Sequence, residues 1–395
     1  MTLGWRRVLL ALALLVPVAA TPAAAQQLQC DRCHGELELL RQRVRSLEDA
    51  ERLLAPSDVL HASAHGALAC AECHTGVTRY PHDAGAETRA CASCHAPADS
   101  AWGRGAHANV QDRDPVRCTS CHGIHDVATV ATWESASGIP MANAACLACH
   151  EAHSMPAGGP HTNTVLCASC HGAHDVRPPV DISSTLHPLR QVETCGGCHE
   201  RIAEIWQRDV HADTLRALGA PGHVAAETLP GCTACHDGHG MIHPDSAAFP
   251  ANSVDRCAAC HERRANSYFG SYHGKATVLG SSVVATCADC HGAHGIRPST
   301  EVASLVHADN LVDTCGNCHE HARPAFVKYD SHPEPLNRAR NPWIFYSFVF
   351  MNSVLIMTLI VFGLHTLLWW IRIELDRRRG VGPGHGGGSG HAGGA

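Results

Sequence analysis

The sequence lacks the side chains of an ordinary globular core. Aromatic residues make up only 5% of its 395 residues, whereas glycine (35) and proline (22) are plentiful. An enzyme of this length normally buries a large apolar core. This sequence has too few aromatic side chains to build such a core from side chains alone. Lysine is scarce too, since Lys275 and Lys328 are the only two, and the formal net charge is −7. That charge argues against a phosphate-binding surface and therefore against a nucleic-acid partner.

No cysteine falls outside one repeated motif, because the 22 cysteines form eleven Cys-x-x-Cys-His sequences. Disulfide scaffolds of this density are normally short. Zinc sites would not need a histidine in every copy, and a redox dithiol would occur once, on a βαβ unit. The spacing is that of c-type haem attachment, in which two thioethers hold the porphyrin and the adjacent histidine is the proximal iron ligand.

The predicted attachment cysteines share this spacing, and each second cysteine is followed by the predicted proximal histidine. They are Cys30, Cys33 and His34; Cys70, Cys73 and His74; Cys91, Cys94 and His95; Cys118, Cys121 and His122; Cys146, Cys149 and His150; Cys167, Cys170 and His171; Cys195, Cys198 and His199; Cys232, Cys235 and His236; Cys257, Cys260 and His261; Cys287, Cys290 and His291; Cys315, Cys318 and His319.

From Cys30 to about His332 the chain resembles the multihaem c-type cytochromes, in particular those with doubled Cys-x-x-Cys-His motifs. Its motifs come in pairs: the sequence from Cys167 realigns on that from Cys287 at an offset of 120, and a third copy begins at Cys118. Looser pairs start at Cys70 and Cys232, and the motif of Cys30 stands alone. One pair cannot bury its haems, so we expect a stacked repeat array. The predicted fold is mainly α, with short helices and extensive loops around the haems and little β-structure.

One ordinary amphipathic segment follows the first motif. Leucine and valine recur with a/d-like spacing within Glu36–Ala55, and charged residues fill the other positions. The pattern predicts one amphipathic helix. It either packs on the haem domain or forms a short coiled coil with a partner.

The histidine excess predicts a second histidine ligand for each iron. Eleven of the 32 histidines are proximal, and only six methionines are present. Two-histidine ligation gives a relatively low potential, because methionine ligation raises it. Thirteen candidates compete for eleven places, so at least two must be wrong. Five follow a motif, and the other eight precede motifs or occupy repeat-matched positions; together they are His65, His107, His125, His153, His161, His174, His187, His211, His239, His273, His294, His307 and His332. Weaker signals fall on His61, His82, His223, His243 and His321. For any one of them, the alternative is a propionate hydrogen bond or a surface position.

Five candidates follow their motif as Cys-x-x-Cys-His-x-x-His, namely His125, His153, His174, His239 and His294. The thioethers and the proximal histidine fix the local chain to one face of its own haem. A histidine three residues later stays near that face. We therefore expect these histidines to bind neighbouring haems and to force the haems close together.

Both ends of the chain carry targeting signals. Arg6 and Arg7, the apolar run Val8–Ala20 and small residues up to position 25 indicate a secretory signal peptide over 1–25. Residues 343–371 carry no formal charge, have aromatic residues at both ends, and precede an arginine-rich stretch. This pattern predicts a transmembrane helix. A cytoplasmic, basic and Gly-rich tail would then occupy 372–395.

The predicted organisation is a signal peptide, a first motif with its helix (26–56), a multihaem domain (57–335), the span and the tail. The haem domain would lie on the periplasmic side of the cytoplasmic membrane. His365 in the span is a candidate contact for a shared b-type haem or a quinone, with a partner subunit completing the site. An interfacial histidine that bonds to lipid or backbone is the equal alternative.

Three functions compete. The first is an electron conduit between a membrane b-type cytochrome or quinone-linked subunit and periplasmic redox partners, as in anaerobic respiration. The second is a multihaem reductase of nitrogen or sulfur oxyanions, which needs one five-coordinate haem. The third is a nanowire-like structural subunit, which the membrane anchor disfavours. No residue of the sequence marks a catalytic site.

Overall fold

The computed structural model describes residues 29–80, 82, 87–110, 115–218, 225 and 228–380. The predicted signal peptide and residues 381–395 of the predicted tail lie outside the described residues. The chain divides into two compact units. Unit 1 comprises residues 1–199, 219–229 and 237–241. Unit 2 comprises residues 200–218, 230–236 and 242–395.

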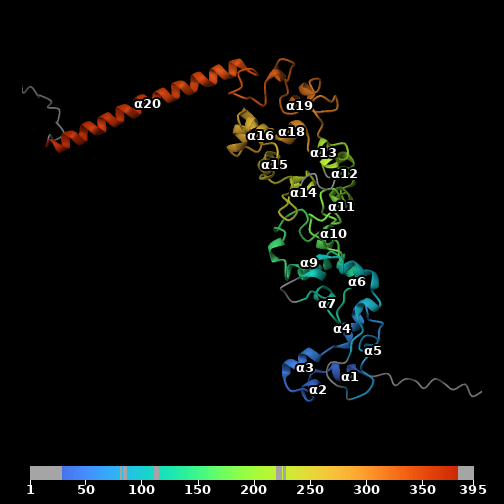
Figure 1. The fold of residues 1–395 in the computed structure, drawn as a ribbon. Helices are drawn as coiled ribbons and strands as arrows, with labels where there is room; N and C mark the ends of the chain where they lie inside the picture. Colours follow the sequence, from blue (N-terminus) through green and yellow to red (C-terminus); the bar gives the residue numbers. More distant parts are fainter. Residues whose placement is uncertain are drawn as a thin grey trace, which may run out of the picture. The chain divides into compact units, whose positions relative to one another are not determined.

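Unit 1 is built from short helices joined by loops (Figure 1). Its elements are α1 (Asp31–His34), α2 (Leu37–Arg41), α3 (Leu47–Leu53), α4 (Ser57–Ala62), α5 (Cys70–Cys73), η1 (Cys91–Ser93), α6 (Ala96–Trp102), η2 (Ala106–Asn109), α7 (Cys118–His122), α8 (Val130–Trp133), α9 (Gly138–Leu147), η3 (Glu151–His153), α10 (Cys167–His171) and α11 (Gln191–Gly196).

Unit 2 has the same character and ends in one long helix. Its elements are α12 (Glu200–Trp206), α13 (Val210–Leu218), α14 (Cys232–Cys235), α15 (Phe249–Ala258), α16 (Glu262–Phe269), α17 (Tyr272–Val278), α18 (Cys287–His291), α19 (Leu311–Gly316), η5 (Phe326–Lys328) and α20 (Pro342–Arg378). The described residues contain no β-strand. The prediction of a mainly α fold with extensive loops is confirmed.

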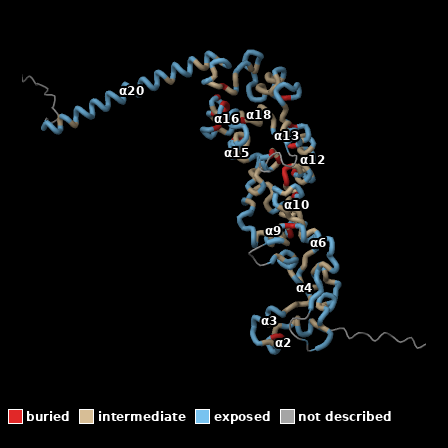
Figure 2. The backbone as a smooth tube through the Cα atoms, in the orientation of Figure 1, coloured by how far each residue is buried: buried red, intermediate tan, exposed pale blue. Residues whose placement is uncertain are grey.

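Side chains bury little apolar surface in either unit. The buried hydrophobic residues of the described chain are few, and three of the eight are alanine: Leu40, Ala50, Ala212, Leu215, Leu229, Val254, Ala265 and Tyr268. Figure 2 shows the buried residues of each unit, polar and apolar together, scattered along the tube. The structure agrees with the scarcity of large apolar residues in the sequence.

The single amphipathic helix predicted for Glu36–Ala55 is wrong. The segment forms two helices, α2 and α3, because the Ser46 side chain accepts the amide hydrogen of Asp49 at 3.0 Å and starts a second helix. Leu40 and Ala50 are buried, but Leu47 is 49% exposed. The a/d spacing is therefore not one continuous buried stripe.

Helix α20 has 37 residues, about 55 Å of helix at 1.5 Å per residue. It contains the predicted span and continues through the arginine-rich stretch. It is the one helix of the described residues that is long and apolar enough to cross a membrane, judged by length and composition. Asn352, Thr358 and Thr366 each donate a hydrogen bond to the carbonyl four residues earlier, at 2.8 Å. These bonds satisfy polar groups that an apolar environment would leave without partners.

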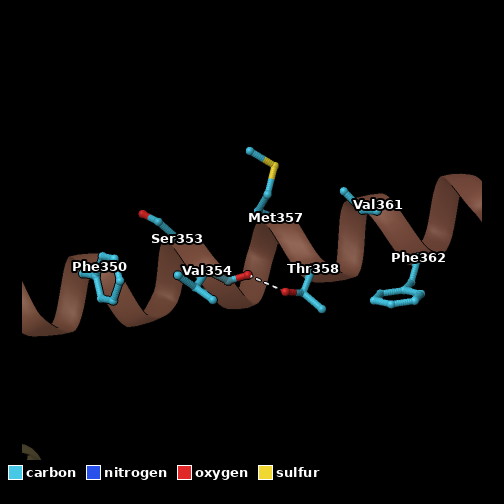
Figure 3. Close-up of a pocket in the computed structure, with 7 residues that line it drawn as sticks. All are labelled: Phe350, Ser353, Val354, Met357, Thr358, Val361 and Phe362. Atoms are coloured by element: carbon cyan, nitrogen blue, oxygen red, sulfur yellow. Dashed lines mark hydrogen bonds between the residues drawn. The ribbon is translucent and has the colours of Figure 1, made fainter.

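One face of α20 carries apolar side chains around a shallow hollow, which Figure 3 shows to be open rather than enclosed. It is lined by Phe350, Ser353, Val354, Met357, Thr358, Val361 and Phe362. All of them lie on the same helix, so the hollow is a surface feature and not a cavity between elements.

Candidate haem-attachment sites

The motifs adopt two local structures. The first motif of a pair forms a helical turn of its own, as in α7, α10 and α18. The second motif of the later pairs begins in the last turn of a longer helix, as Cys257 does in α15. In both, the i and i+3 spacing puts the two cysteines on one helical face, where they can bond to the same porphyrin. The structure joins none of the 22 cysteines in a disulfide.

A glycine redirects the chain after three of the first motifs. Gly123, Gly172 and Gly292 have φ angles of 71°, 75° and 82°, with ψ near 180°. This backbone region is essentially restricted to glycine. The turn ends the motif helix directly after the proximal histidine, so the next histidine leaves the motif in a new direction.

Each of the eleven proximal histidines lies opposite a second histidine, and each pair lies within one unit. Two metal–nitrogen bonds of about 2.0–2.1 Å on opposite sides of one metal place the imidazole centres roughly 6 Å apart. The observed centre-to-centre distances are 5.7–6.3 Å. The residues therefore fit an iron held between two histidines.

With the proximal histidine first, the pairs are His34 and His82, His74 and His125, His95 and His65, His122 and His174, His150 and His107, His171 and His239, His199 and His161, His236 and His294, His261 and His211, His291 and His332, and His319 and His273.

The pairs follow two rules. A second motif takes its partner from upstream, as His150 takes His107. A first motif takes its partner from the His-x-x-His sequence of the next pair, as His122 takes His174. Successive motif pairs are thereby interlocked, each supplying a ligand to the one before it.

Three of the thirteen candidates are placed differently. His187 and His307 each accept a backbone amide hydrogen bond at Nδ1, both at 3.3 Å. His153 lies 5.9 Å from His150, on the same short loop, and 5.1 Å from His239. It is therefore an additional histidine between two pairs.

The eleventh partner is His82, which carried only a weak signal in the sequence. It stacks with His34 at 6.0 Å. Val77 occupies the position at which a His-x-x-His sequence would have followed His74. The unaccompanied first motif therefore needed another downstream histidine, and that requirement was the available signal.

Cysteines of consecutive motifs are neighbours. The thiols of Cys146 and Cys167 hydrogen-bond, which raises the pKa of Cys146 and lowers the pKa of Cys167 to about 7. Cys257 and Cys287 interact in the same way. The same proximity links Cys30 with Cys70, Cys91 with Cys118, Cys121 with Cys149, Cys170 with Cys195, Cys235 with Cys257, and Cys290 with Cys315.

Burial keeps several paired histidines neutral. It lowers the pKa of His171 and His291, and the facing histidine of each pair lowers it further. Neutral imidazole is the form that binds a metal. The electrostatic environment therefore favours ligation at these positions.

Helical turns that carry Cys-x-x-Cys-His, each facing a second histidine, are typical of c-type cytochromes with several haems. Residues 18–96 match the family described as cytochrome c7 and related cytochrome c. Residues 194–245 match the family of cytochrome c554 and c-prime. No curated protein and no solved structure matches the chain. The resemblance to multihaem c-type cytochromes, which bind covalently attached haem, therefore stands on the motifs, the fold and both family matches.

Proposed function

We propose that the chain is a membrane-anchored periplasmic electron carrier with eleven c-type haems. It would pass electrons between a quinone-linked b-type cytochrome in the membrane and periplasmic redox partners. The observation that carries the proposal is the set of eleven histidine pairs at 5.7–6.3 Å. When bound, haem supplies the one-electron chemistry.

The protein's own residues have three roles in this proposal. Each motif's cysteines would tether one porphyrin, and each histidine pair would hold its iron. A second histidine at every proximal position supports carriage of electrons over catalysis, because a reductase would need an iron with an open position. The neighbouring cysteines of consecutive motifs support short steps from one haem to the next.

The membrane side of the proposal rests on α20. Its apolar length and satisfied polar groups support a single span, and Arg372, Arg377 and Arg378 at its end support a cytoplasmic C-terminus by the positive-inside rule. His365 would contact a shared b-type haem or a quinone together with a partner subunit. A lone span cannot provide such a site unaided.

Three measurements test the proposal on the membrane-extracted holoprotein. A haemochrome assay should give about eleven haems per chain, and four or five would refute the count. Electron paramagnetic resonance should show low-spin haem throughout, whereas a native high-spin haem would support the reductase. Mild-detergent purification should recover a membrane b-type cytochrome with the wild type. The variant His365→Leu should keep all c-type haems but should no longer contact the haem or quinone of that partner.

A further inference from the structure

A recurring backbone hydrogen bond links the two second ligands of a motif pair. The residue before the upstream histidine donates to the carbonyl two residues after the His-x-x-His histidine. The bond occurs from Ala64 to Val127, from Ala106 to Val176 and from Val210 to Ile296, at 2.7, 2.8 and 2.9 Å. We call this bond the strut. In the pair that contains His161, Pro160 occupies the donor position and has no amide hydrogen to give.

The residue two positions before the upstream histidine differs between these copies. It is Ser63, Gly105 or Asp209 in the three copies with the strut, and Gly159 in the copy with Pro160. Ser63 accepts only the backbone amide hydrogen of His65, at 3.1 Å. The glycines have no side chain to offer. Asp209 alone of these four brings a carboxylate.

The Asp209 carboxylate is completely buried and binds the ring of His211. Its Oδ1 accepts the backbone amide hydrogen of His211 at 2.7 Å and contacts the ring Nδ1 at 3.0 Å. Its Oδ2 accepts the amide hydrogen of Ile296 at 2.7 Å. The ring of Trp206 lies nearly parallel to that of His211, with the ring centres 6.2 Å apart. A proton kept on Nδ1 by the carboxylate leaves Nε2 as the ring nitrogen that can bind a metal.

We propose that Asp209 is a positioning residue that lowers the reduction potential of the haem attached at Cys257 and Cys260, relative to the haems ligated by His65, His107 and His161. A carboxylate that accepts the Nδ1 proton of a ligating histidine fixes the ring and makes it a stronger electron donor. The stronger donor stabilises the oxidised, more positive iron and so lowers its potential. The inference rests on the proposed pairing of His211 with His261.

The first test replaces Asp209 by the serine that the chain itself uses at position 63. Asp209→Ser keeps a side-chain acceptor for the amide of His211 and removes the carboxylate from the ring. We expect one of the eleven components of a spectroelectrochemical titration to become about tenfold easier to reduce, a rise of about 59 mV for a one-electron couple. The low-spin resonance of that haem should change its g-values. The control is Asp330→Ser, because Asp330 accepts the amide of His332 at 3.0 Å while the His332 ring bonds to Ser267 instead. It should move no component by a comparable amount.

The converse variant, Ser63→Asp, places a carboxylate beside His65 and should lower the potential of a different component. It keeps the inference testable if Asp209→Ser fails to assemble. Unchanged potentials in both variants, or an equal shift in Asp330→Ser, would overturn the inference. A haem count well below eleven would instead overturn the proposed function, so the two failures are distinguishable.

Discussion

Residues 167–199 in unit 1 and 287–319 in unit 2 are two copies of one motif pair. Both have a motif helix, α10 or α18, and a second helix, α11 or α19, at corresponding places. The buried hydroxyls of Ser184 and Ser304 donate to matching arginine carbonyls at 3.1 and 3.2 Å.

The copies differ in where the first motif finds its second histidine. His171 takes His239 from the following pair, whereas His291 takes His332, which lies just before α20. The same motif pair thus occurs both within the repeat array and as its last member. The terminal copy replaces the missing next pair by a histidine from the segment that leads to the apolar helix.

The largest expected difference between the two copies is whether another histidine can replace a second histidine that has been removed. His332→Ala should leave the haem at Cys287 and Cys290 with an open position, because the other histidine near His291, His261, is itself a proximal histidine that faces His211. Electron paramagnetic resonance should then show one high-spin haem. The control, His307→Ala in the same copy, should leave every haem low-spin. A high-spin haem in the control would contradict the pairing.

In the internal copy, residues 167–199, a further histidine lies near the histidine pair. His153 lies 5.1 Å from His239 and close enough to His171 to lower its pKa. In His239→Ala we therefore expect His153 to take the vacated place and keep the haem mostly low-spin. The double variant His239→Ala/His153→Ala should open it, and His187→Ala should do nothing. Complete opening in the single variant would show that His153 cannot reach.

These ligands show how far the sequence leads. The motif fixes the cysteines and proximal histidines, because thioether spacing is local. The structure places ten of the thirteen candidate histidines opposite a proximal one, since repeats and His-x-x-His spacing mark them. The sequence ranked His187 above His82, although His82 is the one that faces a proximal histidine. Loop geometry decides which ring faces a motif, and the sequence does not reveal it. Likewise, the leucine spacing after His34 could not reveal that Ser46 starts a new helix.

In the terminal copy, alanine substitutions at two glycines should change stability by different amounts, because the two glycines have different backbone conformations. Gly292 has φ 82° and ψ 174°, so Gly292→Ala should destabilise the holoprotein by about 1–3 kcal/mol even though its Cβ would meet only Leu305, at 3.6 Å. Gly316→Ala is the control, because Gly316 ends α19 with no atom within 4 Å of its Cβ position. It should be neutral or stabilising by up to about 1 kcal/mol. Thermal unfolding of the two variants provides the measurement, and equal effects would remove the argument.

The shared hydroxyls should respond alike. Ser184→Ala and Ser304→Ala each remove two hydrogen bonds of a buried hydroxyl, one donated to a carbonyl and one accepted from the amide of Leu186 or Val306, at a cost of about 1–2 kcal/mol. The two losses should agree within about 0.5 kcal/mol, because the sites are distant and equivalent. Denaturant unfolding monitored at the haem absorbance compares them. A loss confined to one copy would mean that the copies are not energetically equivalent.

The smallest expected difference between the two copies comes from the carboxylate–arginine pair in the loop after each first motif. Asp181 accepts the amide hydrogen of Ser183 at 2.8 Å and pairs with Arg177 at 2.9 Å, and these partners hold its pKa below the ordinary 3.8. Glu301, its counterpart, pairs with Arg297 at 3.1 Å. A lowered carboxyl pKa contributes stability that is present above the ordinary value and is lost as the pH falls through the lowered one. Asp181→Asn should therefore lower Tm by no more than about 2 °C at pH 7, and its difference from the wild type should vanish in acid. Glu301→Gln, the matched control, should show a smaller difference at pH 7. If the deficit of Asp181→Asn grew on acidification, the Arg177 pair would not be its source.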